Sequence, residues 1–333
     1  MSRKHYYWLW VYLLFAGCAT PPRDREIASP GAVVHGVRHL FGCFFEFTIF
    51  DIREDRASEL IEEAFVECEK LEALSSVWRP DSEIVNINKN AARIPMTASE
   101  PLREMLQQAL DLSTATDGVF DITIGSVIEI YQLRSQSPRI PRAEELAKAR
   151  ASIGSNAVEL TGSIIKYKKE GAAIDLDGCN KGFALDKAAE ILRRGGVSNA
   201  ILSAGGSSFI SIGPPAAAAP RLIEITDQSE QAVTIINLRD DSLSTSGNWR
   251  RAHIIDGKEI GHIIDPRTGL FIYNNIVSTT VKAPTALLSD VLAKVAIILE
   301  LDGSKPILQK LGASEAVWLY KTEPPGFEHV RFN

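Results

Sequence analysis

The spacing of apolar residues along the chain predicts several helices. Residues 55–74 place apolar side chains three and four positions apart, which is the spacing of an amphipathic helix. A second helix is predicted to begin after Ser99 and to end at Gly118. Residues 181–194 repeat the helical pattern and stop at the pair Gly195-Gly196, a typical helix end.

Strands are predicted where apolar residues alternate with polar ones or form short runs between turn residues. Residues 158–168 have the pattern of a hairpin that turns at Gly162-Ser163. After a strand over 276–282, Pro284 or Thr285 begins a strongly apolar helix that reaches about residue 299. Further strands are predicted at 44–50, 200–203, 222–226, 233–238 and 316–320. Because no regular β-α-β repeat appears, an α+β fold with a mixed, mostly antiparallel sheet is favoured over a doubly wound one.

The amino terminus has the pattern of an export signal. Arg3 and Lys4 precede an apolar run from Tyr6 to Phe15, and small residues follow it. The run is too short to cross a bilayer, which takes about 20 apolar residues. We therefore expect residues 1–17 to be a signal peptide.

Cys18 gives this signal a more specific interpretation. Leu14-Phe15-Ala16-Gly17-Cys18 resembles a bacterial lipobox, although Phe15 stands where leucine is more usual. We expect Cys18 to be lipidated, residues 18–35 to form a tether and residues 36–333 to form the folded domain. The alternative is a plain signal peptide with an incidental cysteine.

Composition excludes some classes of function. The 333 residues are 45% hydrophobic and 23% charged, as in ordinary globular proteins. Cys43, Cys68 and Cys179 are odd in number and far apart, so neither a zinc site nor a disulfide framework is indicated. Loss of residues 1–17 removes Arg3 and Lys4, which takes the net charge from −6 to −8. So acidic a chain is a poor nucleic-acid binder, and a bound polyanion needs local donors and a cation.

The turn from His262 to Gly269 carries the densest chemistry. It holds an imidazole, a carboxylate, a guanidinium and a hydroxyl, on His262, Asp265, Arg267 and Thr268. Pro266 and Gly269 favour a tight turn. Together with Asp290, this set suits a site for phosphate groups and a metal. The alternative is an ordinary Asp-Pro turn between two strands.

Three further segments carry candidate chemistry. In residues 175–186, a strand is predicted to end in a glycine turn before a helix, so that N–H groups and Lys181 face an anion. The pair Gly205-Gly206 stands at a strand end, where the backbone is expected to pass close to another group. Residues 244–250 offer small hydroxyls and a glycine. Each segment taken alone is also consistent with a simple turn.

The order and spacing of these segments resemble the ApbE family, the FAD:protein FMN transferases, from about Gly42 to Tyr320. Further matches are Ser82-Glu83-Ile84 with Asn88, and residues 117–125. The resemblance implies one α+β flavin-binding domain, with FAD in a cleft between two lobes and Mg²⁺ on its pyrophosphate. Members are exported, often as lipoproteins, which implies a lipid anchor on the periplasmic side of the bacterial cell envelope.

The resemblance also implies a reaction. FMN moves from FAD to a threonine or serine of an acceptor flavoprotein, such as the FMN-binding domain of a membrane redox complex, and AMP is released. This is a phosphoryl transfer, in which positioning and charge neutralisation dominate. His262 is then a candidate base for the acceptor hydroxyl, and Asp265 either orients His262 or lies near the metal.

The family pattern assigns the remaining candidates. Phe41 is expected to stack on a ring of FAD, and Lys181 and residues 245–247 to hold its phosphates and adenosine. Asp290 is expected to ligate Mg²⁺, with the segment of Asn180 beside it. The expected FAD-binding residues are Phe41, Asp121, Lys181, Gly205, Gly206, Ser246, Gly247, Arg267 and Thr268.

One departure from the family affects the metal. Lys294 stands where members commonly have a metal-ligating threonine, and an ammonium has no lone pair for Mg²⁺. Two interpretations remain open: an ordinary salt bridge from Asp290 to a solvated Lys294, or an ammonium that takes the place of the metal. Two other functions stay open on the same scaffold, namely an FAD pyrophosphatase and a flavin-binding lipoprotein without turnover.

Overall fold

The computed structural model describes residues 33–214, 218–227, 229–247, 253–255, 258–322 and 326–332. The predicted signal peptide, Cys18 and nearly all of the predicted tether lie outside these residues. In the described part of the chain, no helix has both the length and the apolar character required to span a bilayer.

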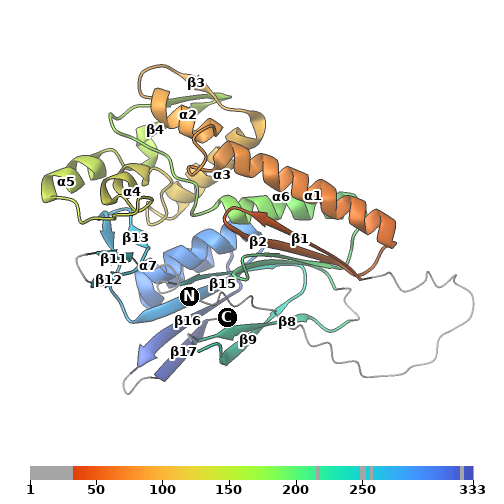
Figure 1. The fold of residues 1–333 in the computed structure, drawn as a ribbon. Helices are drawn as coiled ribbons and strands as arrows, with labels where there is room; N and C mark the ends of the chain where they lie inside the picture. Colours follow the sequence, from red (N-terminus) through yellow and green to blue (C-terminus); the bar gives the residue numbers. More distant parts are fainter. Residues whose placement is uncertain are drawn as a thin grey trace, which may run out of the picture. The chain divides into compact units, whose positions relative to one another are not determined.

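An eight-stranded sheet forms the centre of the fold (Figure 1). Every pair of neighbouring strands in it is antiparallel, which confirms the predicted α+β class. In spatial order the strands are β1 (Val34–Leu40), β2 (Cys43–Ile49), β6 (Ala200–Ala204), β7 (Ser208–Ile212), β10 (Ser242–Gly247), β15 (Ile276–Ala283), β16 (Glu315–Thr322) and β17 (Gly326–Phe332).

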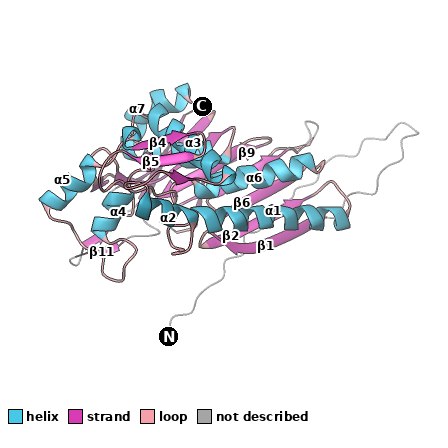
Figure 2. Ribbon diagram, turned by 90° about the horizontal axis from the view of Figure 1, so that it is seen from above, coloured by secondary structure: helices cyan, strands magenta, loops and turns pink. Residues whose placement is uncertain are grey.

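The two faces of this sheet are covered differently. Helices α1 (Glu54–Ser75), α6 (Asn180–Arg194) and α7 (Ala286–Lys310) lie along one face (Figures 1 and 2). The hairpin of β8 (Arg221–Thr226) and β9 (Ala232–Leu238) covers apolar side chains on the other face. The main core therefore lies between the sheet and the three helices. Packing on this core sets the position at which α6 and α7 meet.

Smaller elements surround the ends of these helices. Helices α2 (Glu83–Asn90) and α3 (Glu100–Ala115) accompany a three-stranded sheet of β3 (Met96–Thr97), β5 (Ile164–Tyr167) and β4 (Val158–Thr161). The 3₁₀ turn Ser155–Ala157 precedes β4. Beside them stand α4 (Gly125–Tyr131), α5 (Ala143–Ala151) and the pairs β11 (His253–Ile255) with β12 (Lys258–Ile260) and β13 (Ile264–Asp265) with β14 (Leu270–Phe271).

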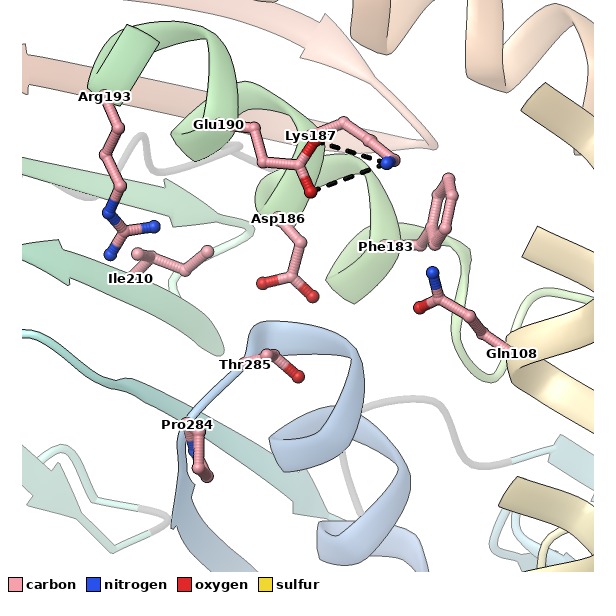
Figure 3. Close-up of a pocket in the computed structure, with 9 residues that line it drawn as sticks. All are labelled: Gln108, Phe183, Asp186, Lys187, Glu190, Arg193, Ile210, Pro284 and Thr285. Carbon is pink, nitrogen blue, oxygen red and sulfur yellow. Dashed lines mark hydrogen bonds and ion pairs between the residues drawn. The ribbon is translucent and has the colours of Figure 1, made fainter. Parts of the chain in front are cut away.

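Helices α6 and α7 approach each other closely at Gly182. A Cβ at this position would lie 2.5 Å from the carbonyl oxygen of Ala286, so only glycine fits. One turn later, Asp186 points from α6 to the start of α7 (Figure 3). Its carboxylate accepts the backbone N–H groups of Ala286 (2.8 Å) and Leu287 (2.9 Å). Asp186 therefore caps α7 from the neighbouring helix.

Burial of Asp186 makes the stability of the fold depend on pH. Desolvation raises its pKa to about 6, from an ordinary value of 3.8. The group thus contributes stability below about pH 4 that is lost as the pH rises through 6, by about 3 kcal/mol at most. In Asp186→Asn, this contribution is absent. We expect the stability of the native protein relative to Asp186→Asn to fall between pH 4 and pH 7, as measured by urea unfolding. An equal difference at both pH values would contradict the assignment.

Candidate functional site

The amino-terminal end of α6 presents unused donors. The N–H groups of Cys179 and Asn180 donate to Leu176 O at 2.9 and 2.8 Å. Within the described ranges, the N–H groups of Lys181 and Gly182 have no acceptor, and the partly exposed Lys181 ammonium has no ion pair. A helix end with free N–H groups and a cation is suited to an anion. The segment before this turn is extended and forms a single bridge, from Ala173 to Ile124, rather than the predicted strand.

Asp290 and Lys294 of α7 lie next to this helix end. Lys294 Nζ donates to Asp290 Oδ1 at 2.5 Å and to the Asp290 carbonyl at 3.1 Å. The stem of Lys294 packs over the turn that precedes α6, since a Cβ on Gly178 would lie 3.7 Å from Lys294 Cε. Asp290 is buried, and only a quarter of the Lys294 side chain is exposed (25%). Asn180 is buried too, and its amide lies 3.5 Å from Asp177 Oδ1.

The predicted glycine pair lies in the turn between β6 and β7. Gly205 and Gly206 adopt φ of +61° and +62°, a region that side-chain-bearing residues rarely occupy. The N–H of Gly205 donates to Phe44 O at 2.8 Å, and a Cβ there would lie 3.1 Å from Cys43 Cβ. The β1–β2 turn, with Phe41 stacked on Phe45, therefore lies against the glycine pair.

Strand β10 brings Ser246 to the same face of the sheet as α7. Ser244 Oγ lies 2.9 Å from Ser289 Oγ of α7, and side chains alternate along a strand, so Ser246 points the same way. Its partner on β15, Thr279, donates to Ala293 O at 2.6 Å. Ser246 therefore lies near the turn of α7 that carries Asp290. Gly247 ends β10, and residues 248–250 lie outside the described part.

The His262 turn joins two cores. Ile263 packs with Leu292 and Ala293 of α7, whereas Ile264 packs with Val127 and Tyr131 of α4. His262, which precedes Ile263, is partly buried, and its neighbour belongs to the same core as α7.

Asp265 shapes this turn through Arg267. Arg267 Nε and Nη2 lie 3.0 and 2.8 Å from the two carboxylate oxygens of Asp265, and the N–H of Arg267 also donates to Oδ1 at 2.9 Å. The hydrogen bond to Asp265 raises the pKa of Arg267. The exposed Thr268 donates to Asp265 O at 3.3 Å. Asp265 and Arg267 thus form a bidentate pair that fixes the turn.

Asp121 makes its hydrogen bonds within its own loop. It is buried before α4, and its Oδ1 accepts the backbone N–H (2.8 Å) and the hydroxyl (2.6 Å) of Thr123. Burial raises the pKa of Asp121. These contacts close the loop that leads into α4.

Trp78 is a candidate that the sequence analysis missed. Its side chain is exposed (61%), and its Nε1 donates to Asp177 Oδ2 at 2.8 Å. The guanidinium of Arg134 stands 5.5 Å from the ring centroid. Since Asp177 immediately precedes the turn that begins α6, the indole lies near the helix end with the free N–H groups. The available signal was a tryptophan in a polar stretch outside any apolar periodicity.

Comparison with known proteins identifies the family. Residues 41–318 match the sequence profile of the ApbE family. The chain belongs to the ApbE family. Proteins named FAD:protein FMN transferase are similar to it, including those of Escherichia coli K12 (28% identity over 95% of this chain and 92% of the relative) and Salmonella typhimurium (28% over 95% and 91%).

Solved ApbE structures share the fold of this ApbE chain. The flavin transferase ApbE from Vibrio cholerae superposes with a TM-score of 0.78 at 25% identity, covering 91% of this chain and 97% of that one. The apo form of the Pseudomonas stutzeri flavinyl transferase ApbE gives a TM-score of 0.81 at 22% identity, covering 92% and 96%. These superpositions confirm the predicted α+β architecture over most of the chain.

The site of this ApbE protein suits the diphosphate of a dinucleotide. Free N–H groups and Lys181 stand at the end of α6, and a Cβ added to Gly206 would have no atom within 4 Å of it. An anion at the end of α6 therefore meets free donors and a cation.

A resident Mg²⁺ does not fit the same residues. Mg²⁺ needs near-octahedral oxygen ligands, but one oxygen of Asp290 already holds the Lys294 ammonium at 2.5 Å. Two unit charges about 4 Å apart repel by about 4 kcal/mol at an effective dielectric constant of about 20, and a dication doubles this. Nowhere in the described ranges do three or more His, Cys, Asp or Glu side chains form a group able to hold a metal.

Proposed function

We propose that this ApbE protein transfers FMN from FAD to a threonine or serine hydroxyl of an acceptor flavoprotein and releases AMP. The name FAD:protein FMN transferase of its relatives supports this reaction. One observation carries the proposal: helix α7 bears some of the candidate groups and packs with the segments that carry the others. This helix bears Asp290 and Lys294, packs on α6 and shares a hydrophobic core with Ile263 of the His262 turn.

The reaction follows from these positions. The diphosphate binds at the end of α6, held by Lys181 and the free N–H groups. The acceptor oxygen attacks the FMN phosphorus, the bond from that phosphorus to the bridging oxygen breaks, and this oxygen leaves with AMP. His262 takes the proton of the acceptor hydroxyl, because an imidazole is partly unprotonated near neutral pH. Catalysis is then mainly positioning and neutralisation of charge.

The cellular setting is part of the proposal. The pattern of residues 1–18 supports export and a lipid anchor on Cys18, on the periplasmic side of a bacterial membrane. The acceptor is then an FMN-binding domain of a membrane redox complex. Replacement of Cys18 by serine is expected to release the protein from the membrane fraction; an unchanged distribution would contradict the anchor.

A product assay tests the reaction. Residues 19–333 are incubated with FAD and a flavin-acceptor domain, and mass spectrometry follows AMP and the mass of the acceptor together. AMP with an acceptor heavier by one FMN unit supports the transferase. AMP with free FMN and an unmodified acceptor contradicts it in favour of a pyrophosphatase, and intact FAD contradicts both.

Trp78 provides a separate test of the position of FAD. An exposed indole near the diphosphate site offers a face for an aromatic ring of FAD, and such stacking contributes about 1 kcal/mol beyond buried area. Trp78→Ala is expected to weaken FAD binding about fivefold in a fluorescence titration. Trp78→Phe keeps the ring but loses the Nε1 contact with Asp177, and is expected to bind FAD nearly as the parent does. Unchanged binding by Trp78→Ala would place FAD elsewhere.

A further inference from the structure

We propose that the Lys294 ammonium is the resident cation of the diphosphate site and does the work of a divalent metal. The inference rests on the proposed binding of FAD at the end of α6. It concerns how charge on the diphosphate is neutralised, and it makes FAD binding independent of Mg²⁺.

The position of Lys294 supports this role. Its ammonium has three protons, of which one goes to Asp290 Oδ1 (2.5 Å) and one to the Asp290 carbonyl (3.1 Å). No described residue accepts the third proton. The stem packs against Gly178, so the side chain lies over the turn leading to the free N–H groups of α6 rather than extending into solvent. The contact with Gly178 favours the second of the two interpretations left open by the sequence.

Asp290 supplies an independent observation. The residue is only 4% exposed, and its Oδ1 fixes the ammonium. Its Oδ2 is buried and has no hydrogen-bond donor among the described residues. A buried carboxylate oxygen without a donor is costly, so Oδ2 marks the place of a ligand donor, such as a hydroxyl of the dinucleotide. Asp290 and Lys294 together then present one acceptor and one cationic donor to FAD.

The charges also favour an ammonium at this place. Lys294 neutralises Asp290, which would otherwise repel a diphosphate, and Lys181 adds a second positive charge at the same helix end. A short amine on a packed stem keeps its position without the ligand shell that Mg²⁺ requires.

FAD binding with and without metal tests the inference. The purified protein is treated with EDTA and titrated with FAD, following flavin fluorescence, in EDTA and again with MgCl₂. We expect Kd values that agree within about twofold. In Lys294→Thr, loss of a charge-assisted contact is expected to weaken binding about 10- to 100-fold in EDTA, and MgCl₂ is expected to restore it, since the variant frees Asp290 for a metal. A parent protein that needs Mg²⁺ to bind FAD would overturn the proposal, as would a Lys294→Thr that binds normally in EDTA.

Matched variants keep the test decisive. Lys310→Thr makes the same change on an exposed residue of α7 beyond its kink at Glu300 and is expected to leave both Kd values unchanged. Lys294→Arg retains a cation and is expected to bind FAD without Mg²⁺ even if Lys294→Thr does not fold, as judged by circular dichroism; a Mg²⁺ requirement in Lys294→Arg would count against the proposal. Because binding is measured without an acceptor, failure of FMN transfer leaves this result standing, and the two proposals fail separately.

Discussion

Replacement of His262 by alanine is expected to abolish FMN transfer while FAD stays bound. The imidazole is the proposed proton acceptor for the attacking hydroxyl, and general base catalysis contributes roughly 10²- to 10⁴-fold to the rate. The diphosphate contacts lie on α6 and α7 and do not involve His262. The rate of acceptor labelling by mass spectrometry and the Kd for FAD by fluorescence measure the two effects separately.

His329→Ala is the matched control for this experiment. His329 is exposed on β17, the edge strand of the sheet, and no step of the proposed reaction uses it. We expect its labelling rate and FAD affinity to equal those of the parent. Transfer at the parental rate in His262→Ala would remove His262 from its role. An equal loss of binding and transfer would make it a ligand of FAD instead.

Gly182→Ala is expected to destabilise the fold strongly. The added Cβ would lie 2.5 Å from Ala286 O and 2.8 Å from both Ala286 C and Leu287 Cα, all atoms of the α7 backbone. Backbone cannot rotate away as a side chain can, so α6 and α7 must separate. Overpacking costs about 1–3 kcal/mol in ordinary cores, and we expect about 3 kcal/mol or more here. Thermal unfolding is expected to show a Tm lower by roughly 6 °C or more.

Gly303→Ala separates this clash from a general effect of the substitution. Gly303 also lies in a helix, but the nearest atom to an added Cβ is a side-chain carbon, Leu299 Cβ, at 3.3 Å. Alanine gains about 1 kcal/mol of helix propensity over glycine, which offsets a mild contact. We expect little change in Tm. If Gly182→Ala had the same Tm as Gly303→Ala, the close approach of α6 and α7 would not be a constraint on this fold.

Periodicity predicted the elements that bury one continuous face. Helices α1 and α6 match the predicted ranges within two residues, because each packs one apolar side on the sheet. Two inner strands of the central sheet, β7 and β10, and its two edge strands, β1 and β17, were missed. Edge strands carry charged side chains that discourage pairing with other chains, and both contain arginine and histidine in place of a clear apolar alternation. The short helices α2 and α4 span only 8 and 7 residues, about two turns each, which is too few for a periodic signal.

The candidate site was predictable as residue types but not as contacts. Lys181, Gly205-Gly206 and the His262 turn stand out because cations, glycine pairs and Asp-Pro turns are local features. The pairing of Asp265 with Arg267 and the contact of Lys294 with Gly178 depend on rotamers and on the packing of α7 against α6. The sequence left two interpretations of Lys294 open for this reason. A neighbour far away in the chain, Gly178, favours one of them.

The attachment of the His262 turn to two cores has a consequence for how the enzyme opens. Ile264 belongs to the small hydrophobic cluster of α4, α5 and β14. Tyr131, which is also in this cluster, donates a 3.0 Å hydrogen bond to Gly269 O of the turn. A cluster of this size unfolds locally at a fraction of the free energy of global unfolding. Such an excursion loosens the imidazole that we propose as the base and leaves the α6–α7 pair intact. We expect this excursion to admit the proposed acceptor protein while the nucleotide stays bound, and amide hydrogen exchange in β13 and β14 to be faster than in α6.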